Sequence, residues 1–242
     1  CEINGMKNKG AIAPSYIADI VVADDLNLSS ISQVYKNGKL VCENGKALFE
    51  CETVDNSKVT NTVHLPKISA DFFKTDVKDK FDAIELIPES IITKKVTVSY
   101  SDSLSKVCVI ERHHNLGTKG IGFVTNYGIT NGAIGTSIGH DSHNVIVIGD
   151  NDSDMALAVN TLGTSGGIAV CSEGKVIASM TLDIAGLMSV KSADEVTREH
   201  DNLYSAAKVL NITDKIDPFL SLAFLPLPLI PEVRITDSGL FD

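Results

Sequence analysis

The 242-residue sequence contains no tryptophan, and aromatic residues make up only 5% of it. Basic residues are also scarce, because 21 Lys and Arg stand against 31 Asp and Glu and leave a net charge of −10. A nucleic-acid backbone or an anionic membrane surface attracts the opposite charge, and single-stranded bases need exposed aromatic rings for stacking. We therefore expect no nucleic acid and no membrane as partner, whereas a small neutral or cationic ligand fits the composition.

The five cysteines lie at wide spacings and include no C-x-x-C pair, so neither a zinc knuckle nor a redox dithiol is indicated. Cys108 and Cys171 lie in apolar, strand-like runs, and we predict that both are buried, reduced thiols. Reduced thiols and the absence of a signal peptide favour a cytoplasmic location. The most apolar run, 219–230, has 12 residues and two prolines. It is too short and too broken to span a bilayer.

Composition and turn signals divide the chain into three parts. Residues 1–66 form a β-rich segment, because Asn37-Gly38 and Asn44-Gly45 are strong hairpin signals between short apolar runs. Residues 67–95 are charged and irregular, and we interpret them as a linker. Residues 96–242 mix strands with helices. The expected fold class is α+β, with the small β segment followed by a mixed α/β sandwich domain.

Periodicity predicts the elements of the last part. The segment 95–100 alternates with period two, and 144–149 is continuously apolar, which is typical of a strand buried on both faces. Further strands are predicted at 106–111 and 121–125, with a hairpin that joins 167–171 to 175–179. One helix follows the caps at 150–152 and ends at Gly163, and another begins at the capping box Ser192 to Glu195.

Two polar clusters could carry chemistry. The first is Glu111-Arg112-His113-His114 and the second is His140-Asp141-Ser142-His143-Asn144, which leads into a buried strand. Such polar groups must either line a cleft or bond to one another, since their burial without partners is costly. Three interpretations of the second cluster stay open: metal ligands or a general base, a serine nucleophile, and a structural turn.

Several catalytic signatures are absent. The sequence has no Gly-x-Ser-x-Gly, no Walker loop, no His-x-His, and neither the His-x-Glu nor the Pro-Cys-x-x-Cys of zinc nucleobase deaminases. The Gly-rich run 128–139 also lacks Gly-x-Gly-x-x-Gly. We interpret its glycines as sites where backbones pack closely.

Longer stretches resemble a known family. The run 126–149, which contains His-Asp-Ser-His-Asn, is similar to bacterial-type adenine deaminases of the amidohydrolase superfamily, as are 152–160, 182–189 and 217–232. Residues 10–22 resemble the segment that follows the catalytic barrel in that family. The chain, which begins with Cys1, is therefore identified as the C-terminal portion of such a protein without its barrel.

The resemblance implies hydrolysis of adenine to hypoxanthine and ammonia in purine salvage or adenine catabolism, by a water that a divalent metal (manganese, iron or zinc) activates. The metal ligands are expected to precede residue 1, with none in this chain. The resemblance assigns site-proximal catalytic roles to His140, Asp141, His143 and Asn144, and substrate binding to Arg112 and His113. It also implies a homo-oligomer, and a chain that is inactive by itself.

Two other hypotheses remain. The chain could be a non-catalytic module that supports or oligomerises a barrel, as the apolar Pro-rich run 219–230 indicates. It could instead be a separate small metallohydrolase that uses His140, Asp141 and His143 as ligands.

Overall fold

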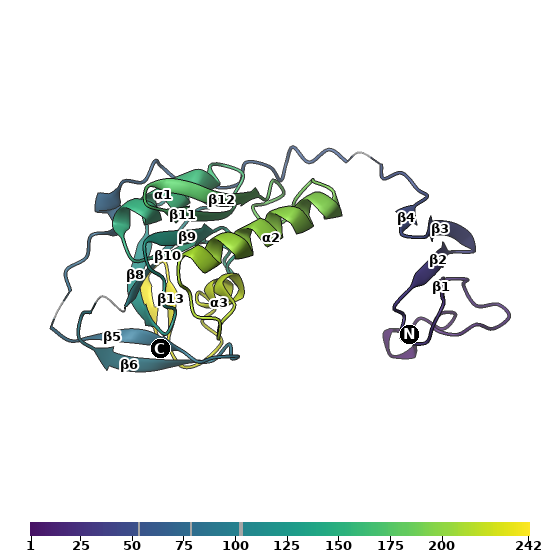
Figure 1. The fold of residues 1–242 in the computed structure, drawn as a ribbon, viewed down its shortest axis with the longest axis horizontal. Coiled ribbons are helices and arrows are strands. Elements are labelled where there is room, and N and C mark those ends of the chain that lie inside the picture. Colours follow the sequence, from purple (N-terminus) through teal and green to yellow (C-terminus); the bar gives the residue numbers. More distant parts are fainter. Residues whose placement is uncertain (53, 78, 102–103) are drawn as a thin grey trace. The chain divides into compact units, whose positions relative to one another are not determined.

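A computed structural model describes residues 1–52, 54–77, 79–101 and 104–242 (Figure 1). The chain divides into two compact units, Cys1–Asp55 and Asn56–Asp242. This boundary lies upstream of residue 66, where composition changes in the sequence. Each unit is described by itself below.

The first unit is a small antiparallel sheet in the order β1-β2-β3-β4. Its strands are β1 (Ile20–Ala23), β2 (Ile31–Lys36), β3 (Lys39–Glu43) and β4 (Lys46–Ala47), and a short 3₁₀ helix, η1 (Glu2–Asn4), precedes them. Asn37 and Gly38 both have positive φ, 49° and 75°, as do Asn44 and Gly45. The two Asn-Gly hairpins are thus confirmed.

The second unit is built on an eight-stranded mixed sheet in the order β12-β11-β9-β10-β7-β8-β5-β6. Neighbouring strands are antiparallel except β5 and β8, which run parallel. The strands are β5 (Phe81–Leu86), β6 (Thr93–Val98), β7 (Ser105–Ile110), β8 (Lys119–Thr125), β9 (Gly132–Thr136), β10 (Val145–Gly149), β11 (Gly167–Ser172) and β12 (Lys175–Thr181). The α+β fold class and the strands predicted in this region are confirmed.

Helices cover both faces of this sheet. Helix α1 (Asp152–Leu162) and the 3₁₀ helix η2 (Ala70–Phe73) pack on one face. Helices α2 (Ala193–Val209) and α3 (Pro218–Phe224) and the hairpin of β13 (Arg234–Thr236) and β14 (Gly239–Phe241) belong to the other. Alternate residues of β10 enter the two cores, Val147 beneath α1 and Ile148 beneath α2 and α3. This two-sided burial explains the continuous apolar run of β10.

Part of the charged segment 67–95 differs from the expected linker. It contributes η2 and β5, and Phe73 and Ile84 are fully buried. Charged and apolar residues share the strand β5. Asp82 reaches the surface and pairs with Lys95 of β6, whereas Ile84 faces the core. The tail after 217 also folds further than the sequence indicated, since it supplies α3 and the β13–β14 hairpin.

The Gly-rich run forms β9, an interior strand of the sheet, which the sequence did not predict. A Cβ atom at Gly135 would lie 3.3 Å from the Cβ of Ala158 on α1. The expected close packing is therefore confirmed, and it holds α1 near the sheet. Cys108 and Cys171 are buried as predicted, and burial raises the pKa of each thiol to about 12.

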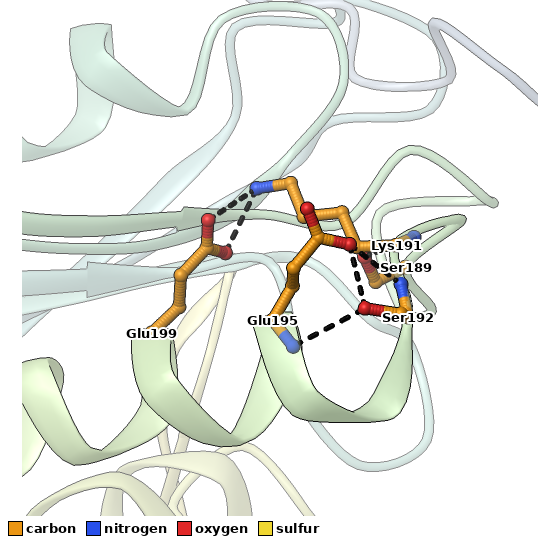
Figure 2. A network of polar contacts seen from close by, with 5 residues as sticks. All are labelled: Ser189, Lys191, Ser192, Glu195 and Glu199. Atoms are coloured by element: carbon orange, nitrogen blue, oxygen red, sulfur yellow. Dashed lines mark hydrogen bonds and ion pairs between the residues drawn. The ribbon is translucent and has the colours of Figure 1, made fainter. Parts of the chain in front are cut away.

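Helix α2 begins at the predicted capping box, which Figure 2 shows from close by. The Ser192 hydroxyl accepts from the backbone N–H of Glu195 at 3.4 Å, and the Glu195 carboxylate accepts from the backbone N–H of Ser192 at 3.0 Å. Lys191 also bonds both carboxylate oxygens of Glu199, at 2.7 and 2.8 Å. Within the described ranges, no helix has the length and apolar character required for a membrane crossing.

Candidate functional site

The antiparallel pairing of β7 with β10 brings the two polar clusters together. Ile110, the last residue of β7, lies opposite Val145, the first residue of β10. Glu111–His114 therefore leaves the sheet beside the point where His140–Asn144 enters it. Sequence separation of about 30 residues hides this contact, and only the strand register creates it.

The same end of the sheet gathers two more segments. Thr136 ends β9 and lies opposite Ile168 of β11, and Gly167, the first residue of β11, lies opposite Thr181 at the end of β12. Ser137 and the loop after β12 thus join the clusters. The Ser137 hydroxyl donates to the carbonyl of Gly186 at 2.6 Å and accepts from the N–H of Gly167 at 2.7 Å.

Arg112 connects these segments from the interior. It is 2% exposed, and its Nη2 donates to the carbonyl of Ala185 at 2.9 Å. Its Nε donates to the carbonyl of His143. The guanidinium therefore ties the end of β7 to the loops before β10 and after β12.

The bonding capacity around Arg112 is not filled. Arg112 Nη1, His143 Nδ1 and Asn144 Oδ1 are buried and have no hydrogen-bond partner among the described residues. Burial lowers the pKa of Arg112, and no carboxylate of the described residues compensates its charge with a hydrogen bond. Buried polar atoms are usually paired, so three unpaired atoms on residues of the same two polar clusters are unusual.

The two histidines of the second cluster occupy different surroundings. The ring of His140 stacks on Phe224 of α3, with centroids 4.6 Å apart and planes inclined by 24°. The ring of His143 is half-buried, and its pKa is lowered first by burial and then by the charges of Arg112 and His140. Asp141 is exposed, with its carboxylate 3.7 Å from Nδ1 of His140.

Glu111 organises the first cluster. Its carboxylate accepts from the backbone N–H groups of His113, His114 and Leu116. Burial would raise the pKa of Glu111, but these donors outweigh it and the pKa is lowered. The carboxylate therefore fixes the turn after β7.

His113 is held by backbone groups rather than by a catalytic partner. Its Nε2 lies 2.7 Å from the carbonyl of Ser142, and its own carbonyl lies 2.9 Å from Nδ1 of His64. The Ser142 hydroxyl accepts from the N–H of Asn144 at 3.4 Å. No histidine ring bonds a serine hydroxyl among the described contacts here, so the arrangement lacks the pair that activates a serine nucleophile.

Sequence reasoning named Arg112, His113, His140, Asp141, His143 and Asn144, and the structure brings them to one end of the sheet. It missed His64, Ser137 and the Ala185-Gly186 turn. No periodic or motif signal marks these three, because each joins the cluster through contacts distant in sequence.

The cluster does not fit a resident metal ion. In the part of the chain that the structure describes, no group of three His, Cys, Asp or Glu side chains is placed to hold one. His140 and His143 have ring centroids 6.5 Å apart, and one ring is stacked on Phe224 while Nδ1 of the other is buried. Ligands must converge on one point, so the small metallohydrolase hypothesis has no support in this geometry.

Comparison with known proteins supplies independent information. Residues 85–242 match the family model of the adenine deaminase C-terminal domain. The chain is 41% identical over 96% of its length to "Adenine deaminase 2" of Carboxydothermus hydrogenoformans, and it covers 43% of that protein. It is also 41% identical to adenine deaminase of Clostridium acetobutylicum and 37% identical to that of Nitratidesulfovibrio vulgaris, and covers 44% of each. It thus spans less than half the length of these relatives.

Proposed function

Because this chain belongs to the adenine deaminase family and matches its C-terminal domain, we propose that it forms the C-terminal part of an enzyme that hydrolyses adenine to hypoxanthine and ammonia. The single observation that carries the proposal is the family match over 96–100% of the chain to proteins named adenine deaminase. The activity would serve purine salvage or adenine catabolism in the cytoplasm.

Within that enzyme, the cluster around Arg112 lies near the substrate site and the chain by itself has no turnover. Support comes from the strand register, which brings the His140–Asn144 run that carries the family resemblance to the same end of the sheet as Arg112 and His113. His140, Asp141, His143 and Asn144 would shape the site, while Arg112 and His113 would support substrate binding.

A divalent ion, manganese, iron or zinc, would activate the attacking water in the whole enzyme. The cluster does not converge on an ion, so its ligands would come from outside this chain. This chain would contribute a polar surface whose loops are held together by hydrogen bonds of Arg112 and Glu111.

Ammonia release from adenine tests the proposal. The 242-residue chain with added manganese should show no turnover, and coexpression with the remaining N-terminal part of the Carboxydothermus relative, of which this chain covers 43%, should restore it. A turnover number near the ordinary enzyme value of about 10 s⁻¹ for the chain alone would refute the proposal that this chain is inactive by itself.

Two substitutions in the coexpressed chain test the role of the cluster. His140→Ala and His143→Ala should each lower turnover by at least about tenfold. His200→Ala is the matched control, since His200 is exposed on α2. Full activity of both cluster variants would disprove a site-proximal role while leaving the family function intact.

A non-catalytic supporting role, with assembly into a homo-oligomer, is the second candidate. The structure gives it one observation, because Leu220 and Leu229 in the Pro-rich segment remain 54% and 81% exposed. Four other apolar residues of that segment are instead buried in their own domain, namely Leu222, Ala223, Leu225 and Leu227. Sedimentation of the chain as a monomer at all concentrations would count against this candidate.

A further inference from the structure

A cavity of about 650 Å³ opens within the second unit, between the turn joining β5 to β6, the C-terminal half of α2 and helix α3. Every residue that lines it belongs to residues 86–234, so the cavity does not depend on how the two units are placed. Its size lies within the range of small-molecule sites, and its walls are mainly apolar, as such sites usually are.

One cation reaches this cavity from the core. Arg234 is 1% exposed, and its Nε and Nη2 donate to the carbonyls of Ile230, at 2.7 Å, and Ile91, at 2.6 Å. Nη1 of Arg234 has no hydrogen bond to a described residue, and this atom is not fully buried. Arg234 is one of the residues that line the cavity, so its guanidinium borders this open space.

Asp217, an acidic residue that lines the cavity, already has hydrogen-bond partners within the protein. The Asp217 carboxylate accepts from the N–H groups of Phe219 and Leu220 at the start of α3 and from the Tyr204 hydroxyl at 2.5 Å. It therefore has little capacity left to bind a cationic ligand. The exposed charges at the rim balance, with Lys208 and Lys215 against Glu89 and Asp214.

From this arrangement we propose that the cavity binds a small organic acid, with an apolar or aromatic body against the walls and its carboxylate on Nη1 of Arg234. Guanidinium and carboxylate form strong, charge-assisted hydrogen bonds, and the surrounding apolar wall excludes competing water. This ligand site is additional to the proposed part in adenine hydrolysis, and its test does not depend on turnover.

Fluorine NMR with 4-fluorobenzoate and its neutral analogue 4-fluorobenzamide tests the proposal on the full chain. The benzoate should bind saturably and about tenfold more tightly than the benzamide, because only the benzoate forms the charge-assisted bond. Equal affinity for the two probes would overturn the proposal. So would the absence of saturable benzoate binding up to a concentration of about 10 mM.

Variants locate the site without disturbing Arg234, whose removal would leave buried carbonyls unpaired. Ser221→Phe on α3 fills the cavity and should weaken benzoate binding at least about tenfold, while Ser205→Phe on the exposed face of α2 should not. Lys215→Glu at the rim should weaken binding about tenfold, while the exposed Lys175→Glu on β12 should leave it within about twofold. A folded Ser221→Phe variant with unchanged affinity, or equal effects of the two lysine variants, would place the ligand elsewhere.

Discussion

Nη2 of Arg112 donates to the carbonyl oxygen of Ala185 across 2.9 Å, and this bond joins the end of β7 to the loop after β12. The two residues are 73 positions apart in sequence. The contact therefore links two segments that are far apart in the chain.

Replacement of Arg112 by Met should lower the free energy of unfolding by about 2–4 kcal/mol, because the carbonyls of Ala185 and His143 lose a buried, charged donor. Urea unfolding followed by circular dichroism measures the change. Arg198→Met on the exposed surface of α2 is the control and should shift stability by less than about 0.5 kcal/mol. A comparable loss in both variants would show that Arg112 has no special structural role.

The His143 ring should titrate below its ordinary range, since burial and the neighbouring Arg112 charge both lower its pKa. A lowered histidine pKa does not change stability above the unfolded pKa of about 6.5, where the ring is neutral in both states. Stability falls as pH drops from there toward the folded pKa, because the unfolded chain then binds the proton more readily. NMR titration of the ring protons measures the pKa. Arg112→Met should raise it if the variant folds, and a pKa of His143 at or above 6.5 in the parent protein would contradict the expected surroundings.

Glu111→Gln should destabilise the second unit by about 1–2 kcal/mol at pH 7, because a neutral amide accepts more weakly from the N–H groups of His113, His114 and Leu116. The lowered pKa of Glu111 means that its contribution is complete above about pH 4.3, the unfolded value, and is lost as pH falls through the folded pKa. The stability difference between parent and variant should therefore shrink on acidification. A difference that is independent of pH from 7 to 3 would argue against a charged Glu111.

Ser192→Ala should cost about 1 kcal/mol, because the N–H of Glu195 loses its capping acceptor at the start of α2. Ser205→Ala, further along the same helix, is the matched control and should be neutral, since the Ser205 hydroxyl only returns to the carbonyl of Asp201. Thermal unfolding of both variants distinguishes the loss of the cap from the loss of any serine hydroxyl on this helix. Equal melting temperatures would show that the Ser192 cap does not stabilise α2.

Local chemistry in the sequence determined much of the architecture. The Asn-Gly turns require positive φ, the Ser192–Glu195 box begins α2, and the apolar run of β10 requires cover on both faces. These signals act over a few neighbouring residues and can be interpreted without knowledge of contacts to distant parts of the chain. The resemblance carried by the His-Asp-Ser-His-Asn run likewise identified the family from residues alone.

The tertiary structure decided what those residues do together. Contacts between distant segments place Arg112 beside His143 and Ala185. Strand pairing makes the Gly-rich run an interior strand, β9, and makes part of a charged segment the strand β5. The fold also stacks His140 on Phe224 of α3 and forms the cavity that Arg234 lines. These outcomes depend on contacts between residues distant in the chain, whose energies arise only when the sheet has formed, so no local pattern could have contained them.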